Sequence, residues 1–394
     1  MATVVIAGGG ISGVAAALAV ARNGHRATVL ERNPEFGELG AGIQLGPNAF
    51  RALDHLGVAD RVRSGAVFID EINLMDGMTG DRITSLPLGA EFSERYRYPY
   101  AVVHRVDLHA ALLDACGQSP LIDLRTDCAV AGYTVDGATV SVRLPSGEVV
   151  TGDALIGADG IRSAVRRQLV GDGEPRVSGH TIYRSVVPIE QVAHELRWNS
   201  VTLWAGPKMH VVHYPIAGGR FFNLAATVDD GATQIVTGKP AARDLVMDTF
   251  AALAPETRRF LDQGQDWRTW VLCDRDPVPR WTDRQVVLIG DAAHPMLQYA
   301  AQGACMALED VVCLDGLLSQ GETDFVELFA AFAAARTGRT AWIQGVSRAI
   351  GEEVYHPSAS AADERTRWLS SLSAAQVHEL VDPLYLGPVT ADIA

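Results

Sequence analysis

The chain has 394 residues, of which 48% are hydrophobic and 20% charged, a composition typical of a folded enzyme long enough for two or three packed units. Its net charge of −14 and the lack of a Lys/Arg-rich stripe argue against nucleic acid as a partner. No signal peptide and no apolar run of about 18 residues occur, so we expect a soluble, cytoplasmic protein without a membrane span.

The first thirty residues predict a dinucleotide site. An apolar run over 4–7 is typical of a buried parallel strand, and an alanine-rich helix follows it. Between them stands G-x-G-x-x-G, a turn in which the glycines permit a tight bend, close approach to a pyrophosphate and packing of helix on strand. Its glycines, which we assign to cofactor binding, are Gly8, Gly10 and Gly13.

The second strand of this unit, over 27–30, ends at an acid. The carboxylate of Glu31 can accept hydrogen bonds from ribose hydroxyls, and Arg32 beside it is assigned to the same cofactor. This pattern alone does not distinguish FAD from NAD.

Two later apolar runs also end in an acidic turn. The run over 154–156 leads into Gly-Ala-Asp159-Gly, and the run over 286–289 leads into Gly-Asp291. Between the first unit and these runs, Arg105 stands just before an amphipathic helix. Each acid alone could be an ordinary turn former.

The order of these motifs, which ends in "GDAAHP", resembles that of the single-component, class A FAD-dependent aromatic hydroxylases over nearly the whole chain. The resemblance implies that Asp291 holds the FAD ribitol, that Arg105 meets the pyrophosphate, and that Asp159 serves both FAD and the pyridine nucleotide. It also implies that Gln44 and Asn48 of "GAGIQLGPNAF" lie near the flavin.

The fold implied by the resemblance is α/β. A Rossmann-like FAD-binding domain of the para-hydroxybenzoate hydroxylase type carries an inserted β-rich substrate domain and a C-terminal helical segment. We expect the FAD-binding domain at 1–75, 100–177 and 275–335, the substrate domain at 76–99 and 178–274, and the helical segment at 336–394. The last segment is interpreted as a cover or dimer element without chemistry of its own, and a homodimer is left open.

A helix is predicted to begin at Gly303 without a Ser, Thr or Asp cap. Its free backbone N–H groups, including that of Ala304, and its positive dipole end suit the negative charge of a reduced flavin. Water or Gln302 could cap it instead. His294, in the loop before this helix, is interpreted as structural and only secondarily as an acid–base residue.

The segment "MHVVHYPIAGGRFF" predicts a strand and a hairpin turn at Gly-Gly. His210 and Tyr214 fall on one face, about 13 Å apart along the strand, and His213 falls on the other. A ring with a polar group at each end fits between the first two. The alternative is that His210 is a structural strand histidine.

The H-x-x-x-Y-P of this strand and the P-x-L-Q-Y before the open helix resemble those of the 3-hydroxybenzoate 6-hydroxylases. This implies that His210 deprotonates the substrate phenol, while Tyr214 and Gln298 position the ring. The resemblance further implies that NADH or NADPH reduces FAD, and that O₂ adds at flavin C4a to give the hydroxylating hydroperoxide. The product expected from 3-hydroxybenzoate is 2,5-dihydroxybenzoate.

Three alternatives stay open. Salicylate or a hydroxynicotinate could replace 3-hydroxybenzoate as the small aromatic acid, and the chain could be a non-catalytic binding protein that kept the FAD fold. A flavin halogenase is disfavoured because its W-x-W-x-I-P motif is missing. No arginine stands in a motif position that would bind the substrate carboxylate. The five cysteines show no metal-ligand spacing, so we expect buried, reduced thiols and no metal site.

Overall fold

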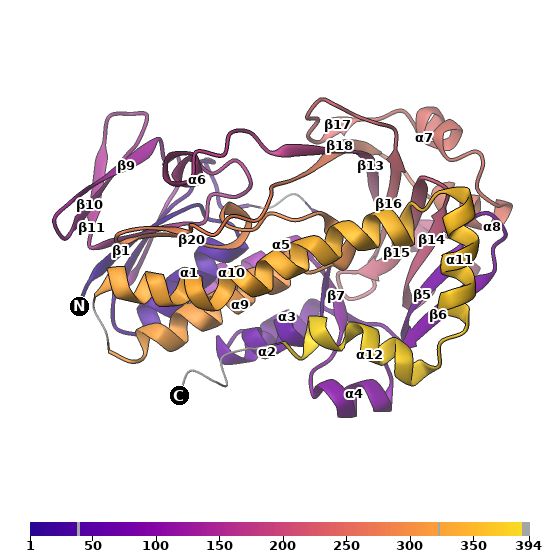
Figure 1. Cartoon of the computed structure of the whole chain (residues 1–394), viewed down its shortest axis with the longest axis horizontal. Helices are drawn as coiled ribbons and strands as arrows, with labels where there is room; N and C mark the ends of the chain where they lie inside the picture. Colours follow the sequence, from indigo (N-terminus) through magenta and orange to yellow (C-terminus); the bar gives the residue numbers. More distant parts are fainter. Residues whose placement is uncertain (38–39, 322–323, 388–394) are drawn as a thin grey trace.

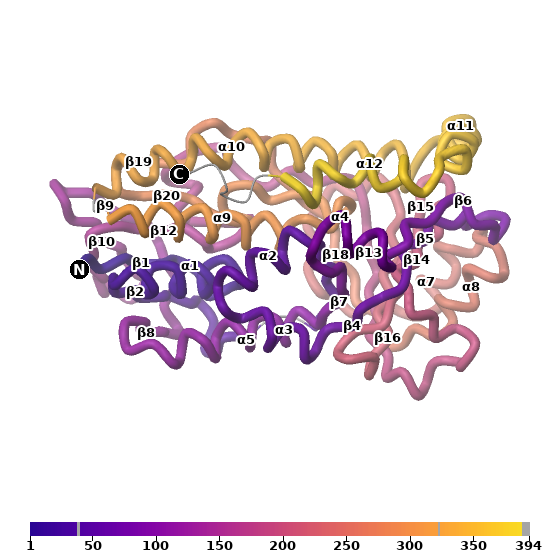
Figure 2. Tube along the Cα trace, turned by 90° about the horizontal axis from the view of Figure 1, so that it is seen from below, coloured from indigo at the N-terminus to yellow at the C-terminus, as the bar shows by residue number. Residues whose placement is uncertain are grey.

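The computed structural model describes residues 1–37, 40–321 and 324–387. The molecule is elongated, with one large sheet toward each end and the long helix α10 (Phe325–Ala349) running between them (Figures 1 and 2). These are the mixed α/β layers expected from the sequence.

The first sheet carries the dinucleotide unit. Within the described residues it has six strands, parallel except for the first edge strand, in the order β19 (Thr282–Asp283), β20 (Val286–Leu288), β12 (Ala154–Gly157), β1 (Thr3–Ala7), β2 (Arg26–Leu30) and β8 (Ile122–Arg125). The central strands read as continuous apolar runs because both faces are covered. Packed around them are α1 (Ile11–Arg22), α5 (Arg105–Gly117) and α9 (Gly303–Leu318).

The second sheet forms the other end of the molecule. Its eight strands in the described residues follow the order β17 (Lys239–Pro240), β18 (Arg268–Asp274), β13 (Arg176–Pro188), β16 (Phe221–Asp229), β15 (Met209–Ile216), β14 (Ser200–Gly206), β5 (Glu71–Asp76) and β6 (Arg82–Pro87). The predicted hairpin is confirmed, because β15 and β16 pair antiparallel and the chain turns through Ala217, Gly218 and Gly219 at positive φ. Against one face of this sheet, α7 (Arg243–Thr249) and α8 (Pro255–Leu261) enclose a second apolar core.

Smaller elements connect the two sheets. Two three-stranded sheets, counted in the described residues, are formed by β3 (Gly42–Leu45), β7 (Ala101–His104) and β4 (Val67–Phe68), and by β11 (Val149–Gly152), β10 (Thr139–Arg143) and β9 (Gly132–Asp136). The short helices among them are α2 (Pro47–His55), α3 (Ala59–Gly65), α4 (Ala90–Tyr96) and α6 (Ala164–Leu169).

After α10 the chain continues in a π-helical turn, η5 (Ile350–Tyr355), and then in α11 (Ala359–Ser370) and α12 (Ala374–Tyr385). Helices α11 and α12 pack against β6 of the second sheet, as Figure 1 shows at the yellow end of the chain. The C-terminal segment therefore contacts both sheets. No helix in the described ranges has the length and apolarity that a membrane crossing requires. All five cysteines are free, and Cys128 and Cys273 are half-buried rather than buried.

A buried network of charges joins α9, α10 and the loop after β20. Asp310, which is 0% exposed, accepts hydrogen bonds from the backbone N–H of Gly290 (3.0 Å), from Nε2 of His294 (2.6 Å) and from Nε of Arg336 (2.8 Å). Arg336 also pairs with Glu309 at 3.0 Å, and Arg339 pairs with the same carboxylate at 2.7 Å. The pKa of Asp310 is lowered because the attraction of its cationic partners and these hydrogen bonds outweigh burial. His294 is thus a structural loop residue, as expected.

Replacing Asp310 with Ala should destabilise the protein strongly. The change leaves Arg336 with one buried partner fewer and strands the N–H of Gly290, and breaking a buried pair costs about 3–5 kcal/mol. Urea denaturation of the variant measures the loss. Glu327→Gln, an exposed change on α10, is the control and should leave stability within about 0.5 kcal/mol of the wild type. Equal stability of Asp310→Ala and the control would contradict the role given to the network.

Candidate active site

The turn between β1 and α1 needs its glycines for the fold itself. Gly8 has φ +102°, and a Cβ there would lie 2.4 Å from the backbone oxygen of Ala158; at Gly13 a Cβ would lie 1.9 Å from the oxygen of Gly8. Gly10 is the N-cap of α1 and provides no side-chain cap. The N–H groups of the first turn are therefore left for an anion such as a pyrophosphate.

Glu31 ends β2 beside this turn. Its buried carboxylate accepts hydrogen bonds from the backbone N–H of Gly9 and of Asn33, both at 2.9 Å. The acid therefore holds the glycine-rich loop and lies at the edge where a ribose would sit, whereas Arg32 is exposed.

The two acids predicted at strand ends lie in different surroundings. Asp159 caps α6: it accepts hydrogen bonds from the hydroxyl of Ser163 and the N–H of Ala164, and burial raises its pKa. This is the turn-forming role that the sequence left open, so a role toward FAD or NADH stays a prediction. Asp291 is exposed, and its carboxylate has no hydrogen-bond partner among the described residues. It is the acid available to a ligand.

The prediction of an uncapped helix at Gly303 is confirmed. Helix α9 begins there, with Gln302 as N-cap and no side-chain cap. Gln302 does not cap the helix with its side chain, and its Oε1 instead accepts a hydrogen bond from Nδ2 of Asn48 at 2.9 Å. A Cβ at Gly303 would meet no atom of residues 1–37, 40–321 or 324–387 within 4 Å. A flat group could therefore approach the backbone N–H groups at this end of α9.

Four further cofactor candidates surround these helix ends. Arg105 opens α5 at the end of β7, and Ala304 follows Gly303 in the first turn of α9. Gln44 lies on β3, with its Oε1 bonded to the hydroxyl of Tyr100, and the oxygen of Gln44 lies 4.0 Å from Sγ of Cys305 near the start of α9. Asn48 also lies near the start of α9, because its Nδ2 donates hydrogen bonds to Oε1 of Gln302 and to Oε1 of Glu309.

The second sheet offers one face to this region. His210, Val212 and Tyr214 alternate with His213 along β15, as predicted. The hydroxyl of Tyr214 donates to the oxygen of Gly42 on β3 at 2.9 Å, and burial raises its pKa to about 12. His213 instead stacks on Phe260 at 3.9 Å between ring centroids, in the apolar core on the opposite face. Neither of its ring nitrogens has a hydrogen-bond partner in the part of the chain that the structure describes, and burial lowers the pKa of His213 to about 3.

His210 lies in a cluster of rings that the sequence does not reveal. It is 1% exposed, and its Nδ1 lies 2.7 Å from Nε2 of His356, which follows η5 in the C-terminal segment. His180 on β13 packs against His356 at 4.7 Å between centroids, and its Nδ1 bonds the hydroxyl of Tyr299 at 2.5 Å. Burial and the neighbouring imidazoles lower the pKa of His210 well below its ordinary value. The described residues contain no group of His, Cys, Asp or Glu placed to hold a metal ion.

Gln298 faces this sheet from the loop before α9. Its Oε1 accepts a hydrogen bond from Nη2 of Arg184, on β13, at 2.6 Å. Sequence reasoning missed Arg184, His180 and His356, because each lies outside a motif and reaches the site only through the pairing of β13 with β16 and the packing of η5. The sequence suggested only that His210 could be a structural histidine hydrogen-bonded to a neighbouring group. It did not indicate that this group is a second imidazole.

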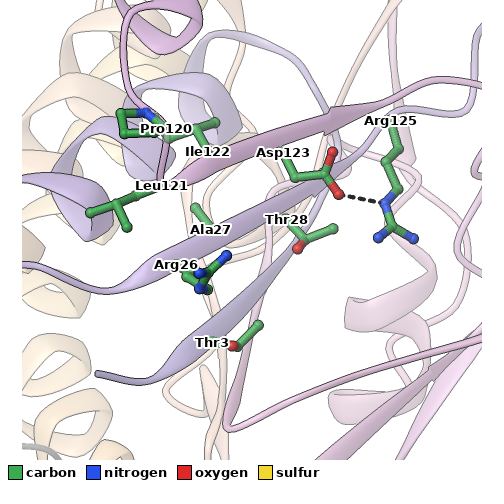
Figure 3. A pocket seen from close by; sticks show the side chains of 9 residues that line it. All are labelled: Thr3, Arg26, Ala27, Thr28, Pro120, Leu121, Ile122, Asp123 and Arg125. Atoms are coloured by element: carbon green, nitrogen blue, oxygen red, sulfur yellow. Dashed lines mark hydrogen bonds and ion pairs between the residues drawn. The ribbon is translucent and has the colours of Figure 1, made fainter.

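A separate hollow of about 400 Å³ lies at the outer edge of the first sheet (Figure 3). It is lined by Thr3, Arg26, Ala27, Thr28, Pro120, Leu121, Ile122, Asp123 and Arg125, and Asp123 pairs with Arg125 at its rim. None of the site candidates lines it. The residues described above, rather than this hollow, form the candidate active site.

These features fit FAD. Two uncapped helix starts, open space at Gly303 and an unpartnered carboxylate at Asp291 supply donors for a pyrophosphate and a flavin and an acceptor for hydroxyl groups. The inner face of the second sheet supplies the histidine and tyrosine expected around an aromatic ring, and the loop before α9 supplies the glutamine.

Comparison with known proteins gives the same assignment. A family model described as an FAD binding domain matches residues 1–323. The 3-hydroxybenzoate 6-hydroxylase 1 of Aquipseudomonas alcaligenes is 45% identical over 97% of each chain. The 3-hydroxybenzoate 6-hydroxylase of Klebsiella oxytoca is 41% identical over 97% of this chain and 96% of its own. Among solved structures, Klebsiella pneumoniae HpxO complexed with FAD and uric acid matches with a TM-score of 0.87 at 24% identity, over 98% of this chain and 97% of that one, which shows the shared fold.

Replacing Gly303 with Asp should weaken FAD binding. The new carboxylate would enter the open space before α9 and oppose a flavin that carries negative charge. We expect the FAD dissociation constant, measured by fluorescence titration of apoprotein, to rise by about tenfold or more, which is about 1.4 kcal/mol. Gly338→Asp, a change in the open middle of α10, is the matched control and should leave the constant unchanged. Similar constants for both variants would refute the assignment of the α9 N-terminus.

Proposed function

This chain belongs to the single-component FAD-dependent aromatic hydroxylases, and we propose that its substrate is 3-hydroxybenzoate, hydroxylated to 2,5-dihydroxybenzoate. The observation that carries the proposal is the sheet face that His210 and Tyr214 share with Arg184, with Gln298 facing it from the loop before α9. The two relatives named above support it, since both are 3-hydroxybenzoate 6-hydroxylases. Salicylate or a hydroxynicotinate is the alternative.

His210 is proposed to remove the phenol proton of the substrate. Its lowered pKa keeps the imidazole neutral near pH 7, so a lone pair is available. In the tautomer in which Nδ1–H of His210 donates to Nε2 of His356, that lone pair lies on Nε2. Nε2 then accepts the phenol proton, and the resulting imidazolium can share its other proton with His356. A ring that becomes a phenolate is richer in electrons and more reactive toward an electrophilic oxygen.

Tyr214 and Gln298 are proposed to position the ring. With Oε1 of Gln298 occupied by Arg184, its Nε2 is left to donate to a substrate oxygen. Tyr214 is fixed by its bond to Gly42 and forms the wall opposite His210. Burial of these groups excludes water from the reacting ring.

FAD, when bound, would be reduced by NADH or NADPH. The reduced cofactor would then react with O₂ and so supply the electrophilic oxygen. For this cofactor we propose Gly8, Gly10 and Gly13 at the pyrophosphate, with Arg105 beside them, and Glu31 and Arg32 at the ribose. Asp291 is proposed at the ribitol, Gly303, Ala304 and Gln44 at the flavin, and Asp159 near the route of the pyridine nucleotide. A homodimer stays a prediction.

The domain boundaries are likewise proposed. Residues 1–75, 100–177 and 275–335 would form the FAD-binding domain, and 76–99 and 178–274 the substrate domain. The six-stranded sheet falls in the first set, and most of the eight-stranded sheet in the second, with β5 at the boundary. Residues 336–394 would form the C-terminal helical segment, to which His356 belongs.

The proposed substrate can be tested directly. FAD-loaded protein should oxidise NADH much faster with 3-hydroxybenzoate than without it, and the product should be 2,5-dihydroxybenzoate by liquid chromatography and mass spectrometry. Salicylate and 6-hydroxynicotinate are the comparison substrates. Faster turnover with either of them, coupled to hydroxylation, would replace the proposed substrate and keep the reaction type. A protein that binds FAD but hydroxylates no aromatic acid would contradict the proposed activity.

Replacing His210 with Leu should lower kcat/KM by about 10²–10⁴-fold, the usual contribution of a general base. His213→Leu is the matched control, because His213 lies on the same strand but faces the apolar core, where its nitrogens bind nothing. The control should keep kcat/KM within about threefold of the wild type. Steady-state kinetics with 3-hydroxybenzoate compares the two, and an equal loss in both variants would show that β15 acts only as a structural strand.

A further inference from the structure

Arg184 is a cation that has no carboxylate partner among the described residues. Its guanidinium lies 5.7 Å from the ring centroid of Trp270, its Nη2 donates to Gln298, and its buried Nε has no hydrogen-bond partner. No acidic side chain in the described part of the chain forms an ion pair with it. By contrast, the interior arginines Arg166, Arg275 and Arg336 each pair with an aspartate at 3.2 Å or less.

This arrangement is energetically costly until an anion arrives. Burial lowers the pKa of the Arg184 guanidinium, and the nearby charge of Arg105 lowers it further, yet a guanidinium stays protonated in proteins. The Arg184 side chain is half-buried with its Nε fully enclosed, and a partly desolvated charge that lacks a counterion is unfavourable. A planar carboxylate offers two oxygens that match the guanidinium fork and would offset that cost.

The position of Arg184 suits a substituent of the substrate ring. Arg184 pairs in register with Ala225 on β16, and Ala225 pairs with Val212 on β15. Cross-strand partners share a face, so these residues form a row that passes between His210 and Tyr214. Adjacent strands lie about 4.8 Å apart, which places Arg184 about 10 Å from Val212, with only the small side chain of Ala225 between them.

We propose that Arg184 binds the carboxylate of the aromatic acid substrate. The inference rests on the proposed function, since it takes the substrate to be an aromatic acid deprotonated by His210. A ring over Val212 and Ala225 then has two anchors: the hydroxyl meets His210 on β15, and the carboxylate meets Arg184 two strands away. The separation of the anchors selects a ring whose carboxylate and hydroxyl are not adjacent, which favours 3-hydroxybenzoate over salicylate.

The test uses paired ligands that differ only in charge. FAD-loaded wild type, Arg184→Met and Arg184→Lys are titrated with 3-hydroxybenzoate and with 3-hydroxybenzamide, and binding is followed by the change in flavin absorbance. In Arg184→Met the Kd of the acid should rise by about 30-fold or more, because a desolvated charge pair is lost. The Kd of the amide should change by less than about threefold. Arg184→Lys should fall between, since it keeps the charge and loses the fork.

Arg268→Met is the matched control. Arg268 lies opposite Arg184 on β18 but is exposed and bonds the oxygen of Gly238, so both dissociation constants should stay at wild-type values. If Arg184→Met weakens the acid and the amide equally, or loses FAD, Arg184 supports the fold or the flavin and the inference is wrong, although the proposed function stands. If the wild type binds another aromatic acid instead, the same acid-to-amide comparison with that ring decides the inference. If it binds none, both proposals are wrong.

Discussion

The hydrogen bonding of the buried Asp310 carboxylate is the constraint on which the proposed flavin side of the site depends. The carboxylate holds the loop after β20 through the N–H of Gly290 and the ring of His294, and its charge is balanced by Arg336 of α10. The other end of that loop is fixed where Gln302 accepts a hydrogen bond from Asn48. Between these two points lie the exposed carboxylate of Asp291 and the open start of α9. Both can remain unpartnered within the chain because the backbone that carries them is tied on either side.

The same network explains why the C-terminal segment belongs to the site. Arg336 anchors α10 to α9, and α10 leads directly into η5 and His356, whose ring lies against His210 on the other sheet. Side chains from two separate stretches, the loop before α9 and the residue after η5, therefore contact the second sheet. Gln298 contacts Arg184, Tyr299 contacts His180, and His356 contacts His210. These contacts enclose the face of β15 that carries the proposed base, and a dry enclosure strengthens each charge interaction within it.

How much could be predicted from the sequence depends on how far apart along the chain the interacting residues lie. The glycine turn, the strand ends at Asp159 and Asp291, the bare helix at Gly303 and the alternation along β15 are local patterns, and the structure places each element where it was expected. Arg184 and His356 were missed because β13 and η5 approach β15 only in the folded chain, and neither residue has a neighbouring pattern that marks it. Asp159 is a different case. Its motif was visible in the sequence, but only the structure reveals that its carboxylate caps α6.

Local charge, rather than the net charge of −14, governs how the pocket handles an acid. An aromatic acid enters with one negative charge, which the unpaired Arg184 would neutralise. The proposed base, His210, would enter the reaction neutral, because burial and the adjacent imidazoles hold its pKa low. Transfer of the phenol proton would then create a phenolate and an imidazolium together, so the enclosed site would gain no net charge during the step. A second arginine beside the hydroxyl would also stabilise a phenolate, but it would bury another uncompensated cation before the proton moves. A neutral histidine avoids that cost and becomes charged only when its partner does.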